Sequence, residues 1–258
     1  MKDLMNKSVH NLSSEGTGSE PVILKIYNFL FNSYGPQGWW PLTELHGNGG
    51  TNPTKTGSVK GYHPGDYTYP HTENQQFEII CGAMLTQNTN WQQVERALIN
   101  LKQVDSLSPE GIVTLDPETL KEAIKPAGYY NQKAVRLKIL AEWFLELKDR
   151  TPEREELLSI KGVGPETADS ILLYAFKQSS FVVDAYTRRI VNNLGLADEK
   201  AKYSEIKVLF EENLPEDLIV YQEYHALLVE HAKRYYQKKI NYSQCPLLKI
   251  TLTEVTGI

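Results

Sequence analysis

Apolar residues recur at helical spacing along most of the chain. The segment 23–35, ILKIYNFLFNSYG, has apolar side chains at positions i, i+3 and i+4, which predicts an amphipathic helix that ends at Gly35. Residues 75–87 are nearly all apolar on one side, so we expect a helix at the centre of the fold. Only FVVD at 181–184 has the character of a strand, and four residues cannot support a sheet. Further helices are expected at 91–103, 117–125, 131–147, 154–160, 165–176, 184–195, 202–214 and 216–237. The pattern predicts an all-α fold.

Two stretches lack this helical pattern. Residues 1–22 are mostly polar, and we expect them to form a disordered lead. Residues 46–74 are crowded with Gly, Pro, Asn and Thr and contain almost no aliphatic side chains, which predicts a long surface loop. Whether that loop shapes a binding site or only connects two helices is left open by its composition.

Composition excludes several classes of protein. No apolar run approaches the ~20 residues that span a bilayer, and the amino terminus lacks the apolar middle of a secretory signal, so we expect a cytoplasmic protein. Two cysteines, Cys81 and Cys245, cannot supply a disulfide framework, a four-cysteine zinc site or an all-cysteine iron-sulfur cluster. The six histidines show no H-E-x-x-H or H-x-x-E-H spacing, which disfavours a zinc hydrolase.

The charge pattern is compatible with nucleic acid only locally. The net charge is -5, yet basic residues gather at 121–138 and 233–239. Such a basic patch can follow a phosphate backbone, and it can equally be a solvated helix face.

A glycine-rich turn joins two short helices between residues 157 and 176. Gly162 and Gly164 permit a tight hairpin, and Pro165 and Glu166 suit the first turn of the second helix. Backbone N–H groups at such a turn can bind a phosphate without a side-chain cation. A plain helical hairpin with glycines at its turn is the alternative.

Asp184 follows this hairpin and begins the next helix. The order L-x-x-I-x-G-V-G-x-x-T-A and then V-D-x-x-x-x-R resembles the endonuclease III superfamily of DNA glycosylases, which combine a helix-hairpin-helix, a Gly/Pro-rich loop and a catalytic Asp. GAMLTQNT at 82–89 and GYYNQKAVRL at 128–137 are similar to two further motifs of that superfamily. The resemblance extends over residues 23–237.

Two departures from the superfamily pattern narrow the resemblance. Bifunctional members carry a lysine nucleophile where this chain has Glu166, and Lys161 lies on the other side of the hairpin, so we expect no efficient lyase activity. Only Cys245 lies beyond residue 81, so we expect no iron-sulfur cluster. With Trp39-Trp40-Pro41, LTQNT at 85–89 and GYYNQKA at 128–134, the chain is most similar to the bacterial 3-methyladenine DNA glycosylases that lack the cluster.

The resemblance implies a fold of two helical lobes with DNA crossing the cleft between them. Residues 23–45 and 190–258 would form one lobe, and residues 75–189, with the helix-hairpin-helix at 157–176, would form the other. The partner would be double-stranded DNA with a damaged base, bound by a monomer near the nucleoid. No cofactor is expected, although a monovalent cation in the hairpin is left open.

The resemblance also assigns site residues. Asp184 would stabilise an oxocarbenium-like transition state. The alternative is that it serves only as a helix N-cap, and the two roles can coexist. The base pocket would contain Trp39, Trp40, Pro41 and Trp91, with only one of the paired tryptophans facing the base, whereas core packing is the alternative for each. Gln87 would fill the gap left by the extruded nucleotide, or cap a helix. Contacts to DNA are expected from Gly162, Val163, Gly164 and Thr167. The basic side chains Lys133, Arg136, Arg188 and Arg189 could contact phosphates, with solvated surface as the alternative for each. Lys238 or Lys239 could enter the site, or simply complement a helix dipole.

These assignments predict a monofunctional DNA glycosylase of base excision repair. It would hydrolyse the N-glycosidic bond of an alkylated purine, since alkylation makes the base a good leaving group, and the expected lesion is 3-methyladenine. The alternatives are a glycosylase for uracil, a mismatched base or an oxidised base, and a non-catalytic helix-hairpin-helix DNA-binding protein.

Overall fold

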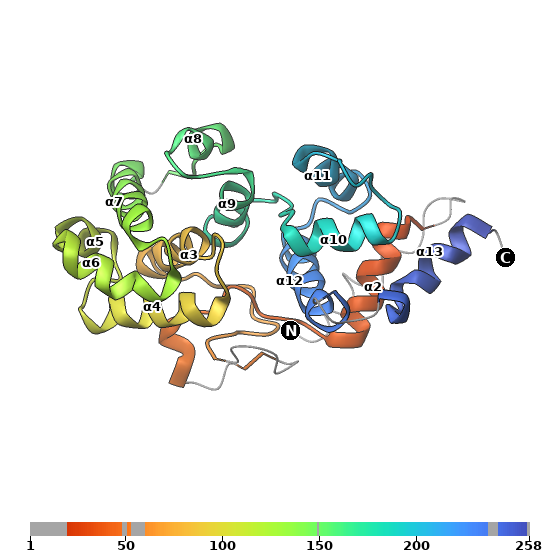
Figure 1. The fold of residues 1–258 in the computed structure, drawn as a ribbon, viewed down its shortest axis with the longest axis horizontal. Coiled ribbons are helices and arrows are strands. Elements are labelled where there is room, and N and C mark those ends of the chain that lie inside the picture. Colours follow the sequence, from red (N-terminus) through yellow and green to blue (C-terminus); the bar gives the residue numbers. More distant parts are fainter. Residues whose placement is uncertain (1–19, 48–50, 53–59, 149, 237–241, 257–258) are drawn as a thin grey trace.

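The computed structural model describes residues 20–47, 51–52, 60–148, 150–236 and 242–256. Within these ranges the chain is helical, and the only β pairing is an isolated bridge between Thr51 and Lys60. The prediction of an all-α fold is therefore confirmed. Figure 1 shows the helices in two groups: α3 to α9 form what we call the central lobe, and α2 with α10 to α13 form the terminal lobe. Most of the predicted lead, residues 1–19, lies outside the described residues.

The terminal lobe pairs the first described helix with a helix near the end of the chain. α2 (Val22–Tyr34) ends as predicted at Gly35, whose φ of 71° terminates the helix. It packs on α12 (Leu218–Tyr235): the hydroxyl of Tyr224 donates to the carbonyl of Ile23 at 2.8 Å, and the rings of Tyr27 and Tyr224 lie 5.3 Å apart. The amino-terminal helix is thus held by α12.

The centre of the central lobe is α3 (Glu73–Leu85), as the apolar sequence predicted. Thr72 caps its start by accepting a hydrogen bond from the N–H of Gln75 at 3.2 Å, and Phe77, Ile80 and Leu85 are completely buried. Around it lie α4 (Trp91–Gln103), α5 (Pro109–Thr114), α6 (Pro117–Ile124), the 3-10 turn η3 (Lys125–Ala127) and α7 (Tyr130–Leu147).

The hairpin and the crossing to the terminal lobe follow α7. α8 (Arg154–Ser159) and α9 (Pro165–Ser170) flank the glycine turn, and α9 continues into one π-helical turn, η4 (Ile171–Ala175). Residues 177–184 then run without a strand partner among the described residues, although Phe181, Val182 and Val183 are buried. The remaining elements are α10 (Ala185–Asn193), α11 (Tyr203–Glu211), the 3-10 turn η5 (Tyr242–Gln244) and α13 (Leu247–Thr256). The predicted lobe boundary at residue 190 falls inside α10, which packs on α12.

A buried carboxylate joins the two lobes. Asp169 on α9 is fully buried and receives both guanidinium contacts of Arg154, at 2.7 and 3.0 Å. Its other partners are the hydroxyls of Ser180 at 2.6 Å and of Tyr203 at 2.7 Å, and the ammonium of Lys207 at 3.5 Å. Burial alone would raise the pKa of Asp169, but these hydrogen bonds and positive charges lower it. Because α8, α9, the crossing segment and α11 all contact this one group, it fixes the connection between the lobes.

The prediction that residues 46–74 form a surface loop is wrong for several of the described residues in this segment. Asn52, Tyr62 and His63 are buried, and α3 already begins at Glu73. The backbone of this segment pairs with the residues around the tandem tryptophans: His63 N–H donates to Gly38 at 3.1 Å. The composition contained no aliphatic signal of burial, since aromatic rings and backbone hydrogen bonds hold the segment in place.

None of the helices formed by the described residues is both long enough and apolar enough to cross a bilayer.

Candidate active site

Asp184 lies where the chain enters the terminal lobe, at the start of α10. Its Oδ1 accepts a hydrogen bond from the N–H of Thr187 at 2.7 Å, as an N-cap does. Its Oδ2 lies 3.9 Å from Nε2 of His225, and the side chain keeps 14% of its surface exposed. One oxygen is therefore fixed by the backbone, while the other faces a buried imidazole.

Aromatic rings gather on the far side of that imidazole. The ring of His225 meets Trp39 edge to face at 5.5 Å and lies 5.8 Å from Tyr174. Trp40 in turn lies 5.8 Å from Trp39, 5.2 Å from Tyr174 and 5.4 Å from Trp91. We call these five residues the aromatic cluster. The structure thus brings the predicted base-pocket tryptophans together, next to Asp184.

The tandem tryptophans differ in exposure. Trp39 is partly exposed, whereas Trp40 retains 5% of its surface and Pro41 is buried. The Nε1–H of Trp40 has no hydrogen-bond partner among the described residues and faces α3, where a Cβ at Gly82 would lie only 2.8 Å away. The peptide bond between the two tryptophans is cis. Trp39 is therefore the member of the pair that can present a face to a ligand, and Trp40 packs behind it.

Two buried carboxylates hold the segment that carries these tryptophans. Glu223 of α12 accepts from the N–H of Gln37 at 2.7 Å, and Glu78 of α3 accepts from the N–H of Thr43 at 2.6 Å and from its hydroxyl at 3.0 Å. Burial raises the pKa of each carboxyl to about 7, although their hydrogen bonds oppose that rise. Residues 37–43, which we call the tryptophan segment, are thus attached to the terminal lobe at one end and to the central lobe at the other.

The hairpin has the geometry that its glycines predicted. Gly162 has a φ of 92°, and a Cβ there would clash with the side chain of Arg136. Gly164 is the N-cap of α9 with Pro165 in the first position, and Val163 is buried with its N–H bonded to the carbonyl of Ile160 at 3.0 Å. In the described part of the chain, the N–H groups of Gly162 and Gly164 make no hydrogen bond, so both are available to an acceptor from outside.

Gln87 and Thr167 contact each other and the hairpin in this structure, and their predicted roles toward DNA stay predictions. The amide nitrogen of Gln87 donates to the carbonyl of Gly162 at 3.0 Å and to the hydroxyl of Thr167 at 2.9 Å, and its oxygen accepts from Arg136 at 2.8 Å. Thr167 is itself buried. These side chains brace the hairpin against the end of α3, because their polar atoms satisfy one another.

Lys133 is not a surface contact for phosphate. It is 1% exposed, and its ammonium donates to the carbonyls of Leu85, Gln87 and Ala127, each at 2.8 Å. Burial, with the nearby charge of Arg136, lowers its pKa to about 8. This lysine caps the carboxyl ends of α3 and η3, where helix carbonyls lack partners within the helix.

The other predicted basic contacts are placed differently. Arg188 donates to the carbonyl of Ala201, which turns its guanidinium toward the segment before α11. Arg189 is exposed, donates to the carbonyl of Tyr236 at 2.7 Å and lies over the ring of Tyr186. Lys238 and Lys239 lie outside the described residues. Neither arginine points freely into solvent beside Asp184.

Glu166 occupies the first turn of α9 and is accessible to solvent. Loss of hydration within the surrounding protein, and then the negative charge of Asp184, raise its pKa to about 7. At the position where bifunctional relatives carry the lysine nucleophile, this chain therefore has a carboxyl whose pKa depends on the charge of Asp184.

Sequence reasoning missed Tyr129, Tyr174 and His225. Tyr129 is 67% exposed with a φ of 46°, directly before α7 and after Gly128. A tyrosine that follows a glycine within a motif could have marked Tyr129 as a candidate for an exposed ring. No comparable signal marked Tyr174 and His225, because their contact joins residues from η4 and α12 that are distant in the sequence.

The cysteines do not fit an iron-sulfur cluster of the kind that the superfamily implies. Cys81 is buried within α3, and Cys245 is buried beside Nε2 of His231 at 3.2 Å and the hydroxyl of Tyr236 at 3.3 Å. A four-iron cluster needs four thiolate ligands, and the whole chain contains two cysteines.

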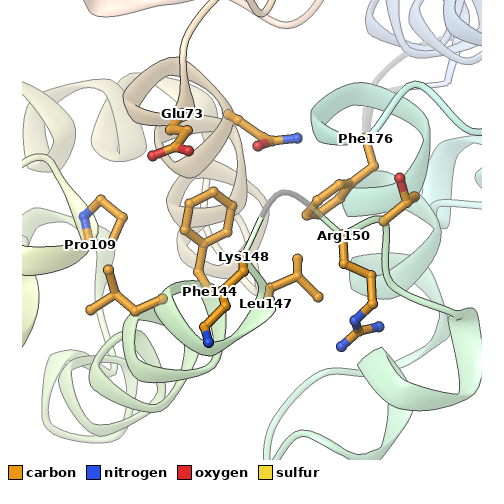
Figure 2. A pocket seen from close by; sticks show the side chains of 10 residues that line it. Glu73, Pro109, Phe144, Leu147, Lys148, Arg150 and Phe176 are labelled. Carbon is orange, nitrogen blue, oxygen red and sulfur yellow. The ribbon is translucent and has the colours of Figure 1, made fainter.

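A surface pocket lies away from this site. Figure 2 shows it between the start of α3 and the end of α7, with Glu73, Phe144, Lys148 and Phe176 around it. Its volume is about 170 Å³. It shares no residue with the aromatic cluster or Asp184. The candidate active site is therefore defined by Asp184 and the rings beside it.

Comparisons with known proteins agree with this geometry. A Methanocaldococcus jannaschii protein, MJ1434, whose name describes it as a candidate DNA repair glycosylase, is 44% identical over 90% of this chain and 97% of its own length. Endonuclease III of Thermotoga maritima is 33% identical over 57% of this chain and 70% of its own. Among solved structures, H. pylori 3-methyladenine DNA glycosylase bound to 1,N6-ethenoadenine is 33% identical with a TM-score of 0.58, covering 64% of this chain and 87% of that one.

The fold is shared more widely than the sequence. A non-covalent endonuclease III-DNA complex matches 91% of this chain and 97% of its own with a TM-score of 0.67 at 17% identity, so it bears on the fold alone. The family model described as HhH-GPD superfamily base excision DNA repair protein matches residues 81–216, which contain the hairpin and Asp184. The chain therefore belongs to the HhH-GPD superfamily of base excision DNA repair proteins.

Proposed function

We propose that this protein is a monofunctional DNA glycosylase that releases alkylated purines, with 3-methyladenine as the preferred lesion. The observation that carries the proposal is the position of Asp184, whose free oxygen faces the aromatic cluster. A carboxylate and a partly exposed tryptophan at the same site supply the two things that the reaction needs: charge stabilisation at the sugar and a surface for the base.

The chemistry follows from the leaving group. An alkylated ring nitrogen makes the purine cationic, so its glycosidic bond breaks with the bonding electrons retained by the base, and the sugar becomes an oxocarbenium-like cation. Asp184 stabilises that cation and orients the water that adds to it; the water loses its proton and leaves an abasic site with an intact backbone. Trp39 can stack on the electron-poor ring, an attraction of about 1–2 kcal/mol once it is desolvated.

Lyase chemistry has no nucleophile at the matching position. A lysine amine could attack the sugar and form an imine, but Glu166 presents a carboxyl there. We therefore propose that the strand is left uncut. The endonuclease III relatives do not decide whether this protein cuts the strand, because Glu166 stands where bifunctional members of the superfamily carry a lysine.

Engagement of DNA would involve the hairpin. The unpaired N–H groups of Gly162 and Gly164 can donate to a phosphate, and Gln87, Arg136 and Thr167 hold the turn in the required shape. Tyr129 projects from the end of α7 that adjoins the same brace, and its exposed ring can contact bases. The H. pylori relative supports the choice of substrate, since it was crystallised with an alkylated adenine derivative.

The test is incubation with methylated DNA and chromatographic identification of the freed base. We expect 3-methyladenine to be released, and Asp184→Asn to reduce the rate by about 1000-fold, which corresponds to the ~4 kcal/mol between two unit charges 4 Å apart in a partly screened site. Asparagine is also a good N-cap, so the variant should fold. Asp116→Asn, which changes the N-cap of α6, is the matched control and should leave release unchanged.

A panel of defined lesions separates the alternatives. Release of uracil or an oxidised base in preference to the methylated purine would overturn the substrate assignment, and borohydride trapping of a covalent adduct would overturn the monofunctional assignment. Release that is unaffected in Asp184→Asn would remove this residue from the mechanism.

A further inference from the structure

His225 faces Oδ2 of Asp184, an oxygen that accepts no hydrogen bond from the residues that the structure describes. Its Nε2 lies 3.9 Å from Oδ2, and the imidazole is 5% exposed. The groups around it come from three other elements: Asp184 before α10, Tyr174 on η4 and Trp39 on the tryptophan segment. Glu223 lies two residues earlier on the same helix, α12, but its carboxylate is bonded to Gln37. Asp184 is thus the acceptor toward which Nε2 is directed.

The single proton of the Tyr174 hydroxyl decides which imidazole nitrogen of His225 is protonated. That hydroxyl lies 2.7 Å from Nδ1 of His225 and 3.1 Å from the carbonyl of Gln222, and it can donate to only one of these two acceptors. If Nδ1 carried the proton, the lone pair of Nε2 would face the carboxylate of Asp184. If the hydroxyl donates to Nδ1, Nε2 carries the proton and directs it at Oδ2, which is electrostatically favourable. Tyr174 then holds the imidazole with its Nε2–H toward Asp184, across 3.9 Å, as an electrostatic contact rather than a hydrogen bond.

The imidazole stays neutral in this arrangement. Burial lowers the pKa of His225, although the charge of Asp184 opposes that change. A neutral N–H can orient a carboxylate without cancelling its charge, whereas an imidazolium would remove the charge that an oxocarbenium-like transition state needs.

We propose that His225 is a positioning residue that, held by Tyr174, directs the second oxygen of Asp184 toward the reacting sugar. This inference rests on the proposed function for its kinetic consequence, but its structural basis does not depend on the lesion. It assigns a role to the polar contacts by which Tyr174, on the π-helical turn of the central lobe, meets His225 on α12 and, through it, Asp184.

The structural arm of the test uses the full-length protein without DNA. In ¹⁵N NMR of the histidine side chains at neutral pH, we expect His225 to be neutral with its proton on Nε2, and we expect Asp184→Asn to lower its pKa. A proton on Nδ1, or a His225 pKa that does not respond to Asp184→Asn, would overturn the proposal. This arm gives its answer even if methylated DNA is not the substrate.

The kinetic arm measures single-turnover release of whichever base the lesion panel identifies. His225→Leu should lose about tenfold or more in rate, Tyr174→Phe less, and His225→Gln should regain part of the loss because its amide can donate near the position of Nε2. Affinity for abasic-site DNA should stay constant. In an Asp184→Asn background, His225→Leu should have no further effect, because a residue that acts only through Asp184 cannot act once that carboxylate is gone.

His231→Leu is the matched control. His231 also lies buried on α12 with a tyrosine hydroxyl, that of Tyr34, 2.9 Å from its Nδ1, but its other nitrogen faces Cys245. Its replacement should change the unfolding temperature without changing the release rate of the folded fraction. The assignment would be refuted if His225→Leu lowered the release rate by the same factor in the wild type and in Asp184→Asn. It would also be refuted if His225→Leu and Tyr174→Phe both released the base at the wild-type rate.

Discussion

Replacing Glu223 by glutamine tests how the tryptophan segment is held. The carboxyl is 2% exposed and receives the N–H of Gln37 at 2.7 Å, with Tyr67 and Gly38 as further donors. Glutamine has nearly the same shape, but it cannot ionise. The difference between the two proteins therefore isolates the ionisation of one buried group.

The magnitude follows from the pKa of Glu223, which burial raises from 4.5 to about 7. Between these values the folded protein binds more protons than the unfolded chain, so stability falls as the pH rises through this window. At about 1.4 kcal/mol for each pH unit, the ionisation of Glu223 costs about 3 kcal/mol of folding free energy once the pH exceeds 7. Glu223→Gln escapes that cost, so its stability relative to the wild type should rise by about 3 kcal/mol between pH 4.5 and pH 8.

Urea unfolding of both proteins at pH 4.5, 6 and 8 measures this difference. Glu78 and Glu166 titrate in the same window, but they are present in both proteins and cancel. Glu212→Gln, which removes an exposed carboxylate, controls for the general effect of one fewer negative charge. A relative stability that changes by less than about 1 kcal/mol over the window would contradict the reasoning, because Glu223 would then not titrate as a buried acid.

Two further substitutions test other parts of the site. Gly82→Ala should push the indole of Trp40 away from α3 and slow base release by about tenfold. The free energy of unfolding should change by less than about 2 kcal/mol, because better helix propensity offsets the crowding. Unchanged release and unchanged tryptophan fluorescence would count against the packing described for Trp40. Lys133→Met should cost about 2–4 kcal/mol in urea unfolding, because three carbonyls lose their donor. The salt dependence of DNA binding should stay the same in this variant, whereas a lysine that contacted phosphate would reduce the slope by about 1.

Local signals in the sequence predicted the helices well. Gly35 ends α2 because its left-handed φ stops the helix, and Asp184 begins α10 because its carboxylate can accept from a free N–H, here that of Thr187. Short elements without a clear apolar stripe, such as α5, were not predicted. The helices that carry the hairpin were found because glycine and proline mark their ends.

The candidate site was predicted less completely, because the sequence alone does not show in which direction each side chain points. Lys133 was assigned to the surface from its charge, yet Leu137 and Leu140 follow it at i+4 and i+7, which places it on the buried face of α7. Gln87 was assigned to DNA by the resemblance, and only the folded chain shows that it lies opposite Gly162. The contact of His225 with Tyr174 depends on how two lobes pack, and no local pattern encodes that.

The attachment of the tryptophan segment to both lobes has a consequence for heat inactivation. Because Gln37 is tied to α12 and Thr43 to α3, the distance between those helices determines where the indoles stand. Warming that loosens this spacing would misplace the indoles while every helix is still intact. Discrimination between damaged and normal bases should therefore decline at temperatures where circular dichroism still reports a fully helical protein.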